Sequence, residues 1–212
     1  MAPAIKGALF DFDMTLADSS YAITTCVNLL ADLYGLGKVS RQTVLESIGL
    51  PMEGCFRYYW GDFRQEWLDS YREKFRSEEQ QSLKLYPSAL PTLAALRARG
   101  IKVGVASNRR FAKHVTDITG LTPYLDAIVG LEDVKRAKPE PDVLLIGCER
   151  LGVLPEESIY VGDTDIDMQT AVAAGTRGVG MTTGNFDAEA LAGAGAWRVF
   201  DDLSGVVSFT EE

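Results

Sequence analysis

Two aspartates separated by one residue stand near the start of the chain, in the segment Asp11-Phe12-Asp13-Met14-Thr15. Just after a strand, Asp11 and Asp13 can point the same way, toward whatever lies beyond the sheet edge. Neighbouring carboxylates repel each other, so the pair requires a cation or a shared proton. One carboxylate can attack phosphorus as a nucleophile while the other moves the proton of the leaving group. The non-functional interpretation is a capped turn with two solvated aspartates.

A second acidic group is Gly162-Asp163-Thr164-Asp165-Ile166-Asp167. Asp163 and Asp167 are four residues apart, so a helix that starts here would put both on one face. Carboxylates in this arrangement suit Mg²⁺, which takes hard oxygen ligands and keeps several waters. Asp165 lies off that face and has no assigned role. A cluster of acidic residues at a helix start would explain any one of these aspartates but explains the set poorly.

Hydrogen-bond donors complete the candidate chemistry. Ser107 and Asn108 follow the apolar run that ends at Ala106, where a hydroxyl and an amide ahead of a helix can bind an anion or merely cap the helix. Lys138, held before a proline just ahead of another helix, could reach a phosphate as a point charge, or be a solvated surface lysine.

Short buried strands must position these residues. Apolar runs predict strands at Ile5–Phe10, Ile101–Ala106 and Ser158–Val161, with weaker ones at Ala127–Val129 and Arg177–Val179. Helical segments that end at glycine lie between them: Ala89–Arg99, Arg110–Thr119, Pro141–Leu151 and Asp165–Ala174. This alternation predicts an α/β fold with a parallel, Rossmann-like sheet. The candidate residues all follow strands at their carboxyl ends, which predicts one shared site.

Residues 18–84 interrupt the alternation of strands and helices. They predict helices without a strand, at Tyr21–Tyr34, Ser40–Ile48, Met52–Tyr59 and Arg64–Ser77. We expect a small helical cap domain at 18–84, inserted into a catalytic core formed by residues 1–17 and 85–212. An insertion at this point lies over the carboxyl ends of the strands, where ligands bind such sheets.

Composition limits the classes of function. The 212 residues are 46% hydrophobic and 24% charged, with a formal net charge of -9 and no long Lys/Arg run. We therefore expect no nucleic-acid and no membrane partner. Cys26, Cys55 and Cys148 are too far apart for a CxxC motif and are expected to be reduced, buried thiols. Without a signal peptide or an apolar membrane span, the expected location is cytoplasmic. The oligomeric state is not readable from the sequence.

The combined pattern DFDMTLADS…LYPSALPTLAALRARGIKVGVASN…AKPEPD…YVGDTDID resembles the haloacid dehalogenase-like hydrolase superfamily, in the branch with a helical cap and phosphoglycolate phosphatase-like members. The resemblance covers essentially the whole chain. It implies a Mg²⁺-dependent phosphatase with Asp11 as the nucleophile and Asp13 as the general acid/base. Lys138 would take part in catalysis and, with Ser107 and Asn108, hold the phosphoryl group, while Thr15 would orient the loop at the phosphate site.

The resemblance also implies the metal ligands and the reaction. Mg²⁺ would be held by Asp11, by the backbone carbonyl of Asp13, by Asp163 and by Asp167, the last directly or through water. Haloacid dehalogenases lack the second aspartate of the first motif and phosphonate hydrolases have alanine there, so Asp13 favours hydrolysis of a small phosphate ester.

Three alternatives to this function remain. A phosphosugar mutase would carry arginine where this chain has Met52, unless Arg57 or Arg64 takes its place. A pyrophosphatase or nucleotidase of the same superfamily would share the site. A binding protein that kept the fold would have no need of the intact acidic set.

Other conspicuous residues have simpler interpretations. His114, the single histidine, is expected on a helix surface. The aromatic residues of the cap are expected to pack its core, with Tyr58, Trp60 or Arg57 as second candidates for the substrate pocket. Glu78 and Glu79 are interpreted as a solvated pair near the hinge, and the loop 182–184 is expected near the rim of the site.

Overall fold

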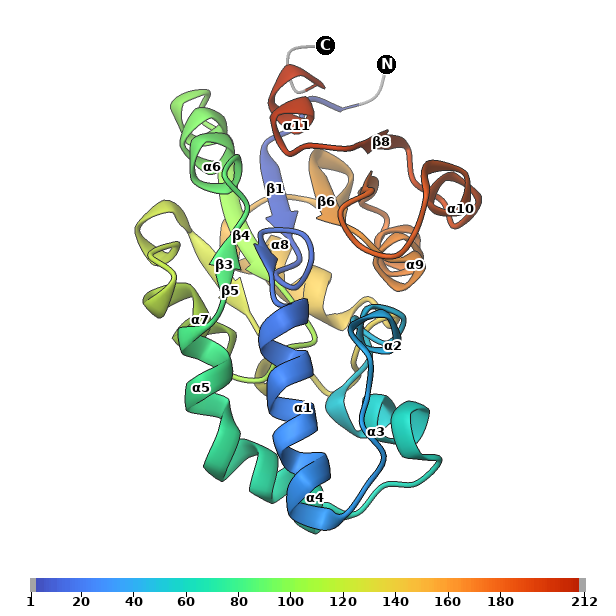
Figure 1. The fold of residues 1–212 in the computed structure, drawn as a ribbon. Helices are drawn as coiled ribbons and strands as arrows, with labels where there is room; N and C mark the ends of the chain where they lie inside the picture. The colour runs from blue at the N-terminus through green and yellow to red at the C-terminus, as the bar shows by residue number, and fades with distance from the viewer. Residues whose placement is uncertain (1–2, 210–212) are drawn as a thin grey trace.

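Parallel strands form the centre of the molecule. The computed structural model describes residues 3–209, and within them a six-stranded sheet has the order β5-β4-β1-β6-β7-β8 with parallel pairings throughout (Figure 1). The strands are β1 (Gly7–Phe10), β4 (Lys102–Ala106), β5 (Ala127–Val129), β6 (Ser158–Gly162), β7 (Arg177–Met181) and β8 (Arg198–Phe200). The predicted α/β class with a parallel sheet is therefore confirmed. Of the six strands of this sheet, the sequence analysis missed the short edge strand β8.

Helices cover both faces of the sheet. On β1, Ala8 and Phe10 point into a core formed with α6 (Ala89–Ala98) and α11 (Ser204–Phe209), whereas Leu9 points into a second core with α8 (Asp142–Leu151) and α9 (Asp165–Ala174). Because neighbouring side chains of a strand point to opposite faces, a strand buried on both sides is apolar throughout. The remaining core elements are α7 (Ala112–Ile118), α10 (Ala188–Gly193) and the 3₁₀ turns Thr122–Tyr124, Leu131–Asp133 and Pro155–Glu157.

The order in which strands are added to the sheet reverses beside β1. From β1 the chain proceeds outward through β4 to β5, and then returns to the other side of β1 to form β6, β7 and β8. In open parallel sheets, ligands bind outside the carboxyl ends of the strands at such a switch point. The segments that follow β1, β4 and β6 are thus placed side by side at one edge.

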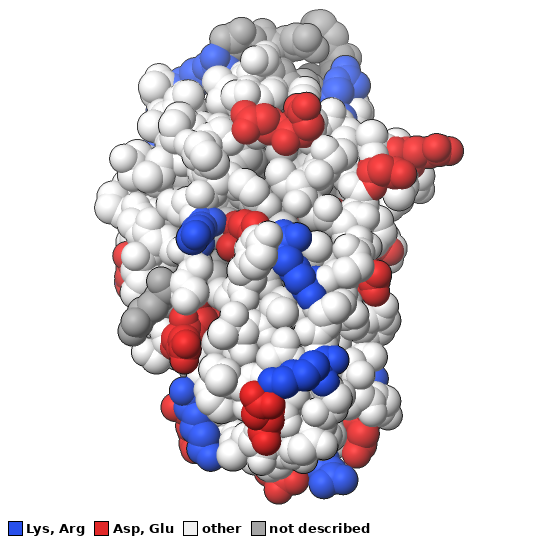
Figure 2. Space-filling view, in the orientation of Figure 1, with Lys and Arg blue, Asp and Glu red and all other residues white. Residues whose placement is uncertain are grey.

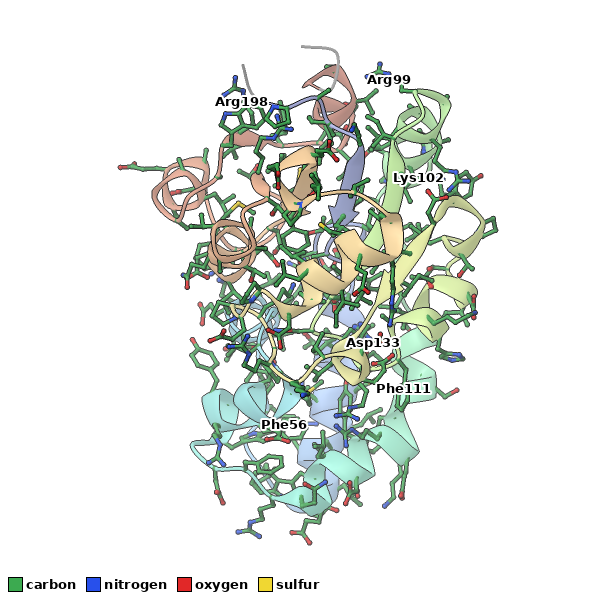
Figure 3. The ribbon with its side chains drawn as sticks, turned by 180° about the vertical axis from the view of Figure 1, so that it is seen from behind. Phe56, Arg99, Lys102, Phe111, Asp133 and Arg198 are labelled. Atoms are coloured by element: carbon green, nitrogen blue, oxygen red, sulfur yellow. The ribbon has the colours of Figure 1, made fainter. Side chains whose placement is uncertain are left out.

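A helical module, residues 20–81, covers that edge and forms the lower end of the molecule in Figure 1. It contains α1 (Ser20–Tyr34), α2 (Arg41–Leu45), α3 (Met52–Trp60), α4 (Gln65–Ser70), a π-helical turn (Tyr71–Phe75) and α5 (Arg76–Gln81). Its own buried core includes Phe56, which Figure 3 labels within the module, together with Trp67 and Leu68. The predicted helix Arg64–Ser77 is thus divided by the π turn and extends to Gln81.

A two-stranded antiparallel ribbon joins the module to the sheet. In it β2 (Ala17–Asp18) pairs with β3 (Lys84–Leu85), with Ala17 opposite Leu85 and Asp18 opposite Lys84. The boundaries 17/18 and 84/85 that we expected from the sequence fall within this ribbon. The division into two domains stays a prediction.

Several smaller expectations can be compared with the structure. Gly100, Gly120, Gly152 and Gly175, which follow the predicted helices, all have positive φ. The helix predicted from Arg110 begins at Ala112 instead, because Phe111 adopts a left-handed conformation with φ 60 that ends any earlier helical turn. The three cysteines are free and buried, as predicted. Between residues 3 and 209, no helix combines the length and the apolar character needed to cross a membrane.

We predict that Leu93→Ala lowers the free energy of unfolding by about 2–5 kcal/mol, because it leaves a cavity in the core between α6 and the sheet. The measurement is urea unfolding followed by circular dichroism. Leu145→Ala is the matched control, since Leu145 is 44% exposed on α8. Equal effects of the two substitutions would contradict the assignment of the core.

Candidate active site

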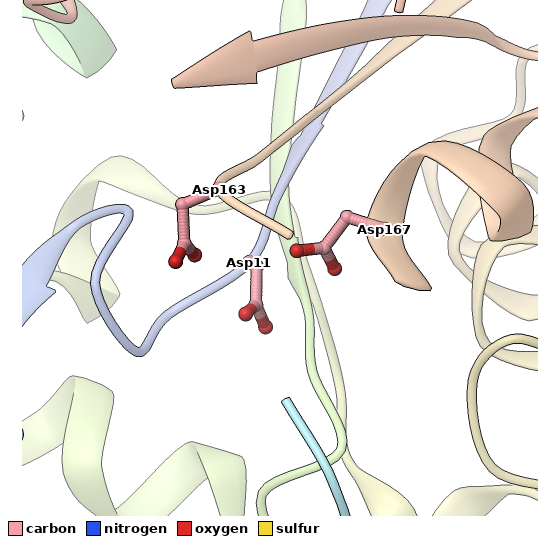
Figure 4. Close-up of side chains that lie close together, drawn as sticks. All are labelled: Asp11, Asp163 and Asp167. Carbon is pink, nitrogen blue, oxygen red and sulfur yellow. The ribbon is translucent and has the colours of Figure 1, made fainter. Parts of the chain in front are cut away.

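Three carboxylates meet at the sheet edge beside β1, where the order of the strands reverses. Asp11 directly follows β1 and Asp163 directly follows β6, while Asp167 comes from the first turn of α9. One oxygen of each lies within 4.8 Å of the others, and all three residues are buried. Figure 4 shows their side chains converging on one space. The sequence therefore placed these three predicted residues together correctly.

Asp163 and Asp167 converge in a different way from the one expected. The helix α9 begins at Asp165, so Asp163 belongs to the preceding turn and does not share a helix face with Asp167. Thr164 caps the helix, and its hydroxyl and backbone N–H both donate to Oδ2 of Asp167, at 2.6 and 3.1 Å. The expectation of a shared helix face was wrong, because the capping turn rather than helical spacing brings the two carboxylates together.

Lys138 lies among the carboxylates, fully buried. Its Nζ donates to Oδ1 of Asp167 at 2.6 Å and to the hydroxyl of Tyr160 at 2.9 Å, and it lies 3.0 Å from Oδ1 of Asp11. Burial alone would lower the pKa of Lys138, but the carboxylates of Asp11 and Asp167 raise it above its ordinary value. The lysine is thus a permanent cation at the floor of the site.

One cation does not balance three buried carboxylates. Burial raises the pKa of Asp11 to about 6, against the opposing effect of Lys138. Burial, followed by the charges of Asp167 and Asp11, raises the pKa of Asp163 well above its usual range. Oδ1 of Asp11 accepts no well-aligned hydrogen bond from any described residue, despite the nearby ammonium group. A buried oxygen of this kind and the surplus of negative charge fit a divalent cation with hard oxygen ligands.

Asp13 points away from this cluster. Both of its carboxylate oxygens bind the guanidinium of Arg109, with Nε 3.0 Å from Oδ2 and Nη2 2.6 Å from Oδ1. Burial would raise the pKa of Asp13, but the Arg109 charge and hydrogen bonds hold it below its usual value. The side chain of Asp13 is therefore not part of the metal-type cluster, and the predicted bond from its backbone carbonyl stays a prediction.

The other three predicted phosphate-binding residues, besides Lys138, have distinct places. Thr15 donates from its hydroxyl to Oδ1 of Asp163 at 3.0 Å, and so orients that carboxylate. Ser107 follows β4 and lies close enough to Asp11 for its hydroxyl to lower that pKa. The amide of Asn108 accepts from the backbone N–H of Lys138 at 2.8 Å and donates to the carbonyl of Gly49 at 2.9 Å. Asn108 thus connects the lysine loop to the helical module.

A pocket opens above this floor, between the sheet edge and the helical module. Its floor includes Asp11, Asp13, Ser107, Asn108 and Lys138. Its other wall is mostly apolar and comes from the module, with Ile23, Ile48, Leu50, Met52, Cys55 and Leu68. The predicted site residues on the floor therefore share one cavity that is roofed by the predicted cap.

The pocket also corrects several expectations. Glu79, interpreted as solvated, is buried and lines the pocket, because α5 turns it inward onto Arg109. Tyr58, Trp60 and Arg57 are not among the described lining residues, whereas Tyr59 is. Arg64, considered as a substitute for a mutase arginine, pairs with Asp62 and Glu66 away from the pocket.

Two further expectations agree with the structure. His114 is exposed on α7, as predicted. Gly184, in the loop expected near the rim, approaches Asp163 closely.

Some functional residues were missed altogether. Arg72, Arg109 and Arg110 line the pocket, and Tyr160 donates to the carbonyl of Ala106 at 2.8 Å beneath Lys138. An arginine directly after the Ser107-Asn108 pair was the available signal for Arg109. A tyrosine within an otherwise aliphatic strand was the signal for Tyr160, since a buried phenol requires a hydrogen-bond partner.

Comparison with known proteins agrees with this geometry. The chain belongs to the haloacid dehalogenase-like hydrolase family, whose model matches residues 8–181. It is 34% identical to a phosphoglycolate phosphatase of Aquifex aeolicus over 172 residues, which is 80% of this chain and 81% of that protein. It is 31% identical to the pyrophosphatase PpaX of Bacillus pumilus, over 88% of each chain.

Solved structures show the same fold. A candidate haloacid dehalogenase-like hydrolase from Bacteroides fragilis superposes with a TM-score of 0.87 at 32% identity, covering 95% of this chain and 99% of that one. A predicted phosphatase from Clostridium acetobutylicum gives a TM-score of 0.86 at 26% identity, covering 97% and 98%. The predicted family and the predicted enzyme class, a phosphatase of this family, are confirmed by these comparisons.

We predict that Gly184→Ala reduces the rate of phosphate release at least about tenfold, because small displacements of catalytic groups are costly. A Cβ at this position would lie 2.0 Å from Oδ2 and 2.9 Å from Cγ of Asp163. Gly193→Ala is the control, since no atom lies within 4 Å of a Cβ built there. Phosphate release and thermal unfolding would be measured together, and full activity in a folded Gly184→Ala protein would contradict the expected contact.

Proposed function

We propose that this phosphatase hydrolyses a small phosphate monoester in a Mg²⁺-dependent reaction through an aspartyl-phosphate on Asp11. The observation that carries the proposal is the position of Asp11. It lies on the pocket floor, next to the ammonium of Lys138 and within the buried carboxylate cluster. A carboxylate that is oriented by a fixed cation and faces a pocket is placed to act as a nucleophile.

The reaction has two steps. In the first, an oxygen of Asp11 attacks phosphorus, the bond from phosphorus to the alcohol oxygen breaks, and Asp13 gives that oxygen a proton. In the second, Asp13 takes a proton from water, whose oxygen attacks phosphorus and releases inorganic phosphate and free Asp11. Lys138 favours the ionised form of Asp11 before its attack in the first step, and in both steps it places positive charge near the phosphoryl oxygens.

The carboxylate cluster would hold the cation. Asp11 and Asp163 are the candidates for direct ligands, whereas both oxygens of Asp167 already accept hydrogen bonds, which favours a contact through water. When bound, Mg²⁺ would supply positive charge that offsets the repulsion between the phosphate and the carboxylates.

The relatives and the charge of the surface support a small substrate. The relatives that match this chain include a phosphoglycolate phosphatase and a pyrophosphatase, and phosphoglycolate is our leading candidate. Acidic and basic side chains are intermixed on the face shown in Figure 2, and no broad basic patch gathers there. This supports a small-molecule phosphate ester rather than a nucleic acid. A cytoplasmic location stays a prediction.

We predict that Asp11→Asn lowers phosphate release by at least about 10³-fold, because the amide cannot form the acyl-phosphate. The assay would use a panel of phosphoglycolate, sugar phosphates, nucleoside monophosphates and pyrophosphate with Mg²⁺. Asp117→Asn, a substitution of an exposed carboxylate on α7, is the control for the change of charge. Turnover of one compound at wild-type rate by Asp11→Asn would reject the covalent mechanism, and no turnover of any compound by wild type would reject phosphatase activity.

A metal-dependent reversal of stability is also expected. In EDTA at neutral pH, Asp163→Asn should unfold at least about 2 °C above wild type. Folding of the wild type must either bury a repelled carboxylate or take up a proton at Asp163, and the amide requires neither. With excess Mg²⁺, the unfolding temperature of the wild type should rise more than that of Asp163→Asn, since a ligand bound only by the folded state stabilises that state. Differential scanning calorimetry would test this. A Mg²⁺-induced shift of equal size in both proteins would rule out Asp163 as a ligand.

A further inference from the structure

A buried chain of charged groups connects the sheet edge to the helical module. The guanidinium of Arg109 pairs with Asp13 of the core and, through Nη1, with Glu79 of α5. Glu79 is 3% exposed, and its other oxygen accepts from the hydroxyl of Tyr71 in the π turn. One arginine is therefore shared by the expected acid/base and by the module that roofs the pocket.

This arrangement is incompatible with proton transfer by Asp13 as it stands. A two-point pair between arginine and a carboxylate is among the stronger charge-assisted contacts, and it occupies both carboxylate oxygens. Asp13 cannot protonate a departing alcohol oxygen while Arg109 holds both of its oxygens. Turnover therefore requires that something replaces Asp13 on the guanidinium.

The pocket favours an anion as that replacement. Apart from Lys138 and Asp11, which belong to the carboxylate cluster, three basic side chains line it against two acidic ones, in a protein whose formal net charge is -9. The basic residues are Arg72, Arg109 and Arg110, and the acidic ones are Asp13 and Glu79. Local positive charge in an acidic protein concentrates anions at that point. Because Arg109 already binds a carboxylate at two points, a substrate carboxylate is the closest chemical equivalent of Asp13.

This inference rests on the phosphatase function proposed above. We propose that Arg109 binds a carboxylate on the leaving group and thereby releases Asp13, which then takes up a proton from solvent and acts as acid and base. The substrate class is then a phosphorylated small hydroxy acid, with phosphate at Asp11 and carboxylate at Arg109. Glu79 keeps the guanidinium at the pocket wall when the bond to Asp13 is exchanged for the substrate. Because Glu79 belongs to α5, the guanidinium stays attached to the helical module during this exchange.

Two substrates that differ only in this group provide the test. Phosphoglycolate and ethyl phosphate have the same phosphate ester and the same length, but the first ends in a carboxylate and the second in a methyl group. We would measure kcat and KM for both, and for pyrophosphate as a third substrate, with wild type, Arg109→Ala, Arg109→Lys and Arg110→Ala. Arg110→Ala removes the same charge from the same pocket without touching the Asp13 pair.

The expected result is a change of preference. Wild type should favour phosphoglycolate at least about 100-fold in kcat/KM, since a site built for a polar group rejects the analogue that lacks it. Arg109→Ala should lose most of that preference through a higher KM for phosphoglycolate, with kcat for ethyl phosphate equal or higher. Arg109→Lys should recover part of the preference, and Arg110→Ala should change it less than Arg109→Ala does.

Three results would overturn the inference. The first is an equal loss of kcat/KM for both substrates in folded Arg109→Ala. The second is the absence of a preference for phosphoglycolate in wild type. The third is an Arg109-dependent preference for pyrophosphate over phosphoglycolate. Arg109→Ala combined with Glu79→Gln keeps the test valid if the single variant fails to fold, because it leaves no unpaired glutamate. Ethyl phosphate hydrolysis that requires Asp11 would leave the phosphatase function standing in each case, whereas no turnover of any ester would reject both proposals.

Discussion

The buried ammonium of Lys138 is the contact on which the rest of the site depends. It bonds Asp167 of α9 and Tyr160 of β6 and lies 3.0 Å from Asp11 after β1. Burying a cation and several carboxylates carries a large desolvation cost, which only close and well-oriented partners offset. The order of the strands brings these segments together, and Asn108 fixes the backbone of Lys138 from the end of β4. The sheet topology and the charge cluster therefore require each other.

The helical module strengthens the electrostatic interactions of that cluster. By roofing the pocket with apolar side chains it excludes water, and electrostatic interactions are stronger where water is excluded. The contact from Asn108 to the carbonyl of Gly49 attaches the module directly to the lysine loop. The ribbon of β2 and β3 lets both connections to the core leave from the same place. The residues with which the module lines the pocket can therefore be substituted while the floor keeps one geometry.

Motifs at strand ends were predictable from the sequence because parallel topology brings all carboxyl ends to one edge. No knowledge of side-chain geometry was needed to group Asp11, Ser107, Lys138 and Asp163. The direction of each side chain was not predictable in this way. Asp13 stands two residues from Asp11 yet turns to Arg109, 96 residues away in the sequence. We expected Glu79 to be solvated because its partner, Arg109, is 30 residues away in the sequence and no local pattern indicates such a pair.

Under the function and the inference proposed above, Lys138 and Arg109 divide the work of the phosphatase between them. Lys138 is bound on all sides by fixed groups of the floor, so it can stabilise charge but cannot move far enough to select substrates. Arg109 is bound by one carboxylate from the core and one from the module, so a loss of the Asp13 bond would leave it attached to the module through Glu79. On these proposals, phosphoryl transfer depends on Lys138. Recognition of the leaving group depends on Arg109, which its bond to Glu79 attaches to α5.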